Sequence, residues 1–177
     1  MSAEEKKTNS GPTQIERFVM ATIKQCQEDK GLAARLRRAD NPATEYQCWE
    51  HLAGFGIDLE KNWIRLPFAT IAAAIARAKP DSNGTLKLGQ AITMCYADGN
   101  GSDQARARLR RLLACDSTEE ACRLLRPVLA LIESRVSQPL DYERLLGQLR
   151  FFGERTRTQW AQELYGKVQE TEGEVAP

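Results

Sequence analysis

The sequence predicts an all-α fold, arranged as two small helical bundles that a glycine-rich linker joins. Apolar residues recur at helical spacing in one segment after another, as Leu145, Leu146 and Leu149 do in residues 137–152. No stretch of useful length alternates apolar and polar residues, as a half-buried strand would. Residues 97–102 place two glycines among small polar residues that cannot pack a core, and we expect the linker there.

The linker divides the chain into an N-terminal helical bundle over residues 13–96 and a C-terminal helical bundle over residues 103–168. Residues 1–12 and 169–177 are polar and charged, so we expect them to be disordered tails. The total of 177 residues is enough to bury a real core.

Capping and breaking residues mark the first two helices. Thr13 and Glu16 have the spacing of a capping box and predict a long helix that ends near Gly31. A short helix follows. It must stop before Asn41, because the residue that precedes a proline, here Pro42, avoids helical backbone angles.

Three more helices are expected before the linker. Tyr46 and Trp49 contribute to the apolar face of the first of them. Pro67 fits the first turn of the next, where its missing N–H costs little. Residues 67–79 are apolar on almost every side, which predicts the central buried helix of the bundle. A short helix is expected within residues 86–96.

The second bundle begins with two capped helices. Ser102 or Asp103 is placed to cap a helix over residues 103–114. A second capped helix follows, and we expect Pro127 to bend it.

We expect the last two helices to pack back to back. Ser137 with Pro139 supplies the start signal of the first, and Gly153 occupies the position where a left-handed residue closes a helix. Trp160 and Leu164 then form the apolar stripe of the last helix.

Composition argues against several classes of protein. The formal net charge is +1, so the chain as a whole lacks the strong positive charge that is typical of nucleic-acid-binding proteins. Five cysteines without C-x-x-C spacing and a single histidine, His51, are too few ligands at suitable spacing for a metal site, and we expect no cofactor. No apolar run is long enough for a membrane span and no signal peptide is present, so we expect a cytoplasmic protein.

Catalytic motifs are absent as well. The chain contains no phosphate-binding glycine loop, no dinucleotide-binding fingerprint and no nucleophile elbow. The paired carboxylates Glu119/Glu120 and Asp141/Glu143 fall in first turns of predicted helices, where capping and the helix dipole explain them. We therefore expect a binding protein rather than an enzyme.

Arginines provide the strongest functional signal. Arg155 and Arg157 lie in or before the first turn of the last helix, where the helix dipole opposes a positive charge. An anionic partner would favour them there, since free N–H groups and guanidinium groups together suit a phosphate. Four more arginines surround the helix over residues 103–114. The alternative interpretation is a set of solvated side chains.

Four segments together resemble the CasB family, the small subunit of the type I-E CRISPR surveillance complex Cascade. The segments are residues 32–42, 86–92 (LKLGQAI), 108–132 and 139–165, and they cover about half of the chain in the family's order. The spacing from Leu140 and Asp141 through Leu145 and Leu146 to Trp160 and Tyr165 is the most specific part.

The resemblance implies an all-helical, two-bundle subunit without catalytic activity, which assembles with other Cascade subunits and with a second copy of itself. It implies sequence-independent contact with the guide RNA (crRNA), with target DNA and with the displaced strand of the R-loop, and no membrane. Carried over by position, the nucleic-acid-binding residues are Arg37, Arg38, Lys87, Arg108, Arg111, Arg126, Arg155 and Arg157.

Two other functions are compatible with the residues. A helical adaptor would bind protein partners through apolar faces and leave the arginines solvated. A helix-turn-helix regulator is suggested by the short helices around Gly54, and it would bind specific duplex DNA.

Overall fold

The structure is a computed structural model, and it describes residues 11–166. Helices account for its regular structure, and the only strand-like pairing within the described residues is an isolated bridge between Leu86 and Leu140, which confirms the all-α prediction. The predicted tails, 1–12 and 169–177, lie outside the described residues except for Gly11 and Pro12. The α-helices are α1 (Gln14–Glu28), α2 (Lys30–Arg37), α3 (Trp49–Gly54), α4 (Asn62–Ala78), α5 (Leu88–Met94), α6 (Asp103–Leu113), α7 (Thr118–Arg135), α8 (Tyr142–Arg150) and α9 (Glu154–Tyr165); the 3-10 helices are η1 (Arg38–Asp40), η2 (Glu45–Cys48) and η3 (Gly99–Gly101).

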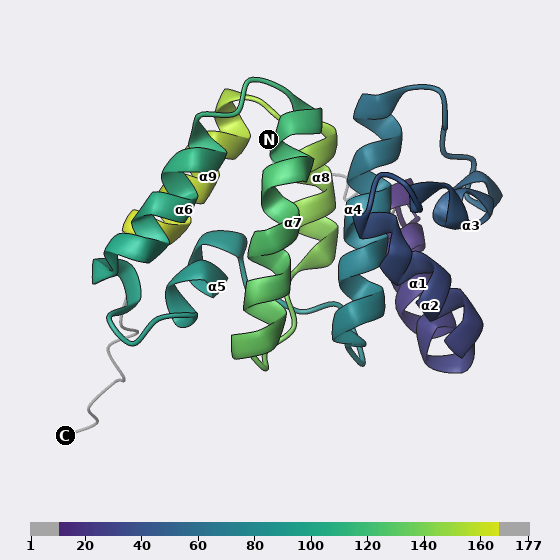
Figure 1. Ribbon diagram of the computed structural model, residues 1–177, viewed down its shortest axis with the longest axis horizontal. Coiled ribbons are helices and arrows are strands. Elements are labelled where there is room, and N and C mark those ends of the chain that lie inside the picture. Colours follow the sequence, from purple (N-terminus) through teal and green to yellow (C-terminus); the bar gives the residue numbers. More distant parts are fainter. Residues whose placement is uncertain (1–10, 167–177) are drawn as a thin grey trace, which may run out of the picture.

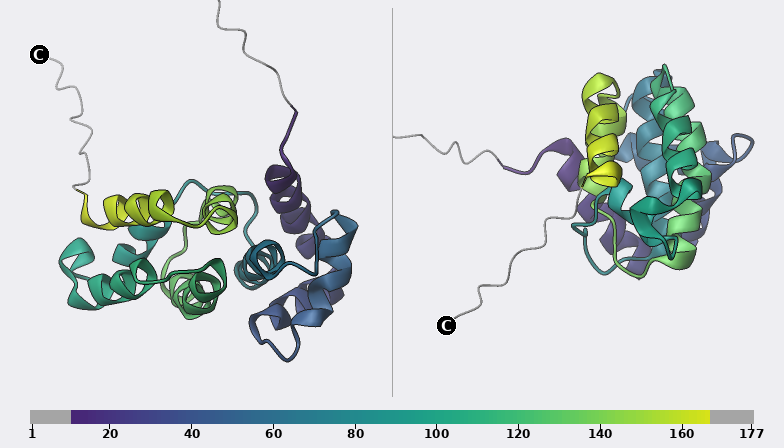
Figure 2. Two further views of the ribbon diagram at one scale, coloured as in Figure 1. Left: turned by 90° about the horizontal axis from the view of Figure 1, so that it is seen from above. Right: turned by 90° about the vertical axis from the view of Figure 1, so that its left-hand side faces the viewer.

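Helix α4 runs between two groups of helices (Figure 1). Helices α1, α2 and α3 lie on one side of it, and α7 with α8 lie on the other. Beyond α7 lie α5, α6 and α9. Seen from above, α8 and α9 form one side of this end of the molecule, and α6 and α7 form the other (Figure 2).

The centre of the core is α4, as its apolar composition predicts. Every residue from Pro67 to Ala76 is buried, and the many alanines let neighbouring helices approach closely. Helix α4 packs against α2 and α1 from the first half of the chain and against α7 and α8 from the second. No helix of the described residues is long and apolar enough to cross a membrane.

The start of α4 differs from the prediction. The helix begins at Asn62, one and a half turns earlier, so Pro67 lies inside it. A proline cannot donate to the carbonyl four residues before it, here Trp63. Arg150 Nη1 lies 3.4 Å from that oxygen and supplies a donor from α8.

Side-chain caps explain most helix starts. Thr13 and Glu16 form the predicted capping box of α1. Helix α1 ends at Glu28 rather than near Gly31, because Asp29 caps the next helix by accepting from the N–H of Leu32. Ser102 caps α6, as predicted, by accepting from the N–H of Ala105.

Three local predictions were wrong. Tyr46 and Trp49 are exposed, because residues 45–48 form a 3-10 turn that rotates the apolar face away from them. Helix α8 is capped by Asp141, not by Ser137 with Pro139. Gly153 has an extended backbone with φ 176° and lies at the N-cap of α9, so it is not a left-handed C-cap.

The predicted linker, residues 97–102, holds the short helix η3 and the buried cap Ser102. Helices on its two sides share one core: α4 packs on α7 and α8, and α5 packs on α9. The division into bundles over 13–96 and 103–168 stays a prediction.

Two glycines permit close approach between distant segments. At Gly84 a Cβ atom would overlap the carbonyl oxygen of Pro139, because the N–H of Gly84 donates to the oxygen of Leu140 at 2.9 Å. At Gly89 a Cβ would lie 2.7 Å from the backbone nitrogen of Leu164, where α5 crosses α9. These contacts fix the segment before α5 to the segment before α8, and α5 to α9.

Candidate nucleic-acid interface

The first arginine group lies where α5, α6 and α7 meet. Arg108 Nε donates to the hydroxyl of Tyr96 at 2.8 Å, and the guanidinium carbon of Arg135 lies 5.5 Å from the centre of the same ring. Arg135 Nη1 also donates to the carbonyl of Cys95 at 3.1 Å. Burial raises the pKa of the Cys95 thiol, and the charges of Arg135 and Arg108 oppose that rise. Two guanidinium groups thus flank one tyrosine.

The second group surrounds the turn between α6 and α7. Arg157 Nη1 donates to the carbonyl of Cys115 at 3.3 Å, and the thiol of Cys115 contacts the carbonyl of Arg111 at 3.5 Å. Arg155 is exposed in the first turn of α9. The N-cap of α9, Gly153, provides no side-chain acceptor, so this helix start remains open to an anion.

The third group lies at η1. Arg37 and Arg38 end α2, and Arg38 Nη1 donates to Gln47 Oε1 at 3.0 Å. Arg126 of α7 reaches the same turn, where its Nη1 donates to the carbonyl of Asp40 at 3.0 Å. Arg126 Nε is buried and has no hydrogen-bond partner in the described residues.

A partly exposed ion-pair network supports the third group. Arg77 of α4 pairs with Asp40 and also with Glu133, where Nε lies 2.9 Å from Oε2. These contacts join η1, α4 and α7, and they hold the backbone that Arg126 contacts. Their role is therefore to position the turn.

Seven of the eight predicted residues fall into these three groups. Arg108 belongs to the first, Arg111, Arg155 and Arg157 to the second, and Arg37, Arg38 and Arg126 to the third. Lys87, the eighth, is exposed at the N-cap of α5, and its ammonium group forms no hydrogen bond or ion pair within the described residues.

Sequence reasoning missed Arg135 and Arg150. Arg135 closes α7, and an arginine in a last turn complements the helix dipole without any ligand. Arg150 closes α8 in the same way, and nothing in its spacing shows that it reaches Trp63. Their neighbours come from other helices, which a single-helix pattern does not reveal.

The histidine and the cysteines are structural. His51 Nε2 and the hydroxyl of Thr22 lie 2.9 Å apart, and the imidazole packs against Phe18 and Phe55. Burial lowers the pKa of His51 to about 4, so the ring is neutral at pH 7. All five cysteines are free and buried, and burial raises the pKa of each thiol. Within residues 11–166, no group of three or more histidine, cysteine and acidic side chains is arranged to hold a metal ion.

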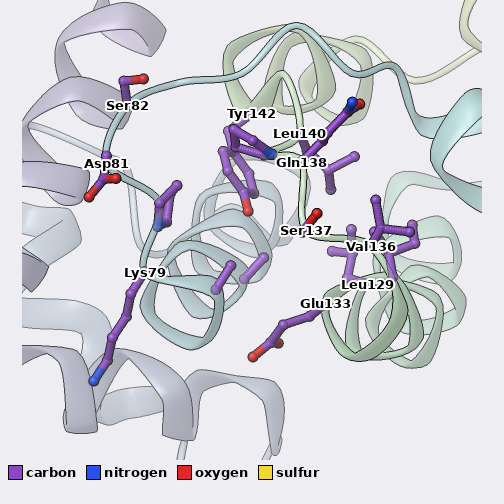
Figure 3. A pocket seen from close by; sticks show the side chains of 15 residues that line it. Lys79, Asp81, Ser82, Leu129, Glu133, Val136, Ser137, Gln138, Leu140 and Tyr142 are labelled. Atoms are coloured by element: carbon purple, nitrogen blue, oxygen red, sulfur yellow. The ribbon is translucent and has the colours of Figure 1, made fainter.

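A pocket of about 450 Å³ lies away from these arginines (Figure 3). It opens between the end of α4 and the segment that precedes α8, and Figure 3 shows the Tyr142 hydroxyl directed between them. Burial raises the pKa of Tyr142 to about 12, with Glu133 adding to the rise. None of the eight predicted residues lines this pocket.

Comparison with known families identifies the fold. The family model described as CRISPR-associated protein Cse2 matches residues 32–165. The chain belongs to the Cse2 family. This match confirms the CasB family of type I-E Cascade that the sequence segments indicated.

Two solved structures are similar to this Cse2 protein. The crystal structure of CasB from Thermobifida fusca is 20% identical, with 88% of this chain and 99% of that chain covered and a TM-score of 0.65. The crystal structure of M. ruber CasB is 21% identical, with 88% and 94% covered and a TM-score of 0.65. These similarities confirm the all-α CasB fold. No curated protein matches the chain.

Proposed function

We propose that this Cse2-family protein is a non-catalytic small subunit of a type I-E Cascade complex that binds nucleic acid through its phosphates, without reading sequence. In that role it supports the heteroduplex of guide and target strand and retains the displaced strand of the R-loop. One observation carries the proposal: within the described residues, none of the eight predicted basic side chains forms an ion pair with a carboxylate.

Neutral groups orient several of these arginines instead. Arg108 uses a tyrosine hydroxyl, Arg38 a glutamine side chain, and Arg126 and Arg157 use backbone carbonyls. A neutral acceptor fixes the direction of a guanidinium without cancelling its charge. The remaining N–H donors suit the planar, bidentate contact that arginine makes with a phosphate.

Three groups of basic side chains on different helices could contact successive phosphates along one nucleic-acid strand. Contacts to phosphates position a nucleic acid but carry no sequence information. In RNA-guided complexes, base pairing with the guide reads the sequence, and the protein holds the backbone. The partners that follow from this proposal are the other Cascade subunits, a second copy of this chain, crRNA and target DNA, in the cytoplasm.

Salt-dependent binding tests the proposal. Fluorescence anisotropy of the purified full chain with unrelated single-stranded DNAs should give affinities that ignore sequence and fall linearly in a log–log salt plot. Each phosphate contact contributes about −0.7 to that slope on a single strand. Replacing Arg155 and Arg157 by alanine should therefore make the slope shallower by about 1.4.

The double variant Lys24→Ala/Lys30→Ala is the matched control, because it removes the same charge from exposed positions outside the three groups. It should leave the slope close to that of the wild type. Binding that does not depend on salt, or that depends on one DNA sequence, would overturn the proposal.

A further inference from the structure

Two exposed aromatic residues lie at the end of α8 and at the start of α4. Phe151 is 74% exposed directly after α8, and Trp63 is 51% exposed in the first turn of α4. Exposed apolar side chains that gather on one surface mark an interaction site, whereas single ones are ordinary.

Arg150 connects the two aromatic positions. Its Nη1 lies 3.4 Å from the carbonyl oxygen of Trp63, and its guanidinium carbon lies 5.0 Å from the centre of the Phe151 ring. The guanidinium thus lies between the exposed ring and the start of α4. Such a pair offers a flat apolar face and a positive charge side by side.

A second ring and guanidinium follow immediately in the chain. The guanidinium carbon of Arg157 lies 5.9 Å from the centre of the Phe152 ring, and Phe152 is held from behind by Trp160, with ring centres 5.8 Å apart. Arg155 stands exposed one turn away. The surface therefore repeats the combination of ring and guanidinium at successive positions.

We propose that Trp63, Arg150 and Phe151 form a stacking platform for unpaired nucleotides. Bases of a single strand stack on this platform, while Arg155 and Arg157 contact the phosphates of the same strand. This inference rests on the proposed function and adds to it a contact with bases. Stacking is tolerant of sequence, because every base has a π face, so the platform is compatible with binding that does not read sequence.

Charge selects a nucleic acid over an apolar protein face. Among the described residues, Arg150, Arg155 and Arg157 have no carboxylate partner, and the nearest acid in sequence, Glu154, makes no ion pair. Elsewhere the same motif is neutralised: Arg65 lies 5.4 Å from the Trp49 ring centre, but its Nε is 2.9 Å from a Glu45 oxygen. An unpaired strand supplies flat bases that can stack on the aromatic rings of the platform. It also supplies the negative charge that its guanidinium groups lack as a partner.

An abasic oligonucleotide separates base contacts from phosphate contacts. The full chain should bind an oligothymidine strand more tightly than an abasic strand of the same length at the same salt concentration. Phe151→Ala should weaken binding to oligothymidine by about 5- to 150-fold, the range of one lost stack, and leave binding to the abasic strand unchanged. Phe151→Trp should retain the preference for bases, whereas Phe151→Leu, which keeps an apolar side chain, should lose it.

Tyr46→Ala is the control, because Tyr46 is 58% exposed and no arginine stacks on its ring among the described residues. It should behave as the wild type on both strands. Equal affinity of the wild type for the two strands, with Phe151→Ala indistinguishable from it, would overturn the platform and leave the phosphate contacts standing. A wild type that binds neither strand at low salt would overturn both proposals.

Discussion

The Glu163 carboxylate joins three helices of the C-terminal half, and its replacement by glutamine is predicted to destabilise the fold. The side chain is only 5% exposed on α9. Its Oε2 accepts from the N–H of Gly89 at 3.0 Å, and its Oε1 accepts from Arg144 Nη2 at 3.0 Å and from Arg144 Nε at 3.3 Å. One carboxylate therefore fixes the first turn of α5 and the first turn of α8 to α9.

The magnitude follows from the acceptors that Glu163→Gln removes. An amide of the same size keeps one acceptor oxygen, so either Gly89 or Arg144 loses its partner, and an NH₂ group faces the remaining donor. A lost hydrogen bond to a charged group costs about 1.5–3 kcal/mol. Because the Arg144 side chain is 34% exposed and water can replace part of the pair, we expect about 2–3 kcal/mol in the free energy of unfolding.

Urea denaturation and thermal melting measure this loss. For a chain of this size the expected change in Tm is a decrease of about 4–10 °C. Glu154→Gln is the matched control, since Glu154 is an exposed acid of the same helix without an ion pair in the described residues, and it should change Tm by about 1 °C or less. A Glu163→Gln variant as stable as the control would refute the role assigned to this carboxylate.

Three further predictions concern other parts of the fold. Gly84→Ala should cost about 1–3 kcal/mol in urea denaturation, because its Cβ meets the backbone of Pro139, whereas Gly101→Ala, with open space around it, should cost far less; equal losses would contradict the close approach. The folded pKa of His51, about 4, lies below its unfolded value of about 6.5, so the unfolded state binds the proton first and stability falls as pH decreases from 6.5 to 4. Between pH 6.5 and pH 4, the free energy of unfolding of the wild type should therefore fall by about 2–3 kcal/mol more than that of His51→Gln. Identical pH profiles of the two proteins would contradict the burial of the ring. Because burial raises the pKa of all five cysteine thiols, a thiol reagent at pH 8 should react slowly with the native protein and titrate five thiols in denaturant, and a thiol that reacts at once in the native state would contradict that burial.

Local signals in the sequence predicted the helices well, because caps and apolar stripes act within a few residues of each other. The capping box of Thr13, the cap at Ser102 and the apolar run of α4 are all of this kind. Pro67 misled the prediction, since its tolerance inside α4 depends on a donor from Arg150, far away in the sequence. The exposure of Tyr46 depends on a 3-10 turn whose apolar stripe differs from that of an α-helix.

The arginine sites show the same limit. The pattern identifies which arginines a single helix leaves without an acidic partner, and these include Arg108 and Arg155. It cannot show that Arg135 joins Arg108 on the ring of Tyr96, or that Arg126 reaches the turn at Asp40, because both contacts bring distant segments together. Grouping is a tertiary property, and the sequence alone predicts only some of the members.

Retention of the displaced strand in an assembled complex tests the central claim most directly. The full chain, the other type I-E Cascade subunits and a guide RNA would be reconstituted on a labelled target, and the lifetime of the R-loop would be measured. The double variant Arg108→Ala/Arg155→Ala removes one guanidinium from each of two groups, and both side chains lie outside the buried core. Lys24→Ala/Lys30→Ala again serves as the control of equal charge.

The account predicts a shorter R-loop lifetime for the arginine variant, a difference that is largest at low salt and shrinks as salt is raised, and a lifetime close to wild type for the lysine control. Circular dichroism and Tm of the arginine variant should match the wild type, which separates lost contacts from lost folding. An R-loop lifetime that is unchanged in the arginine variant, with the variant folded and present in the complex, would contradict the account.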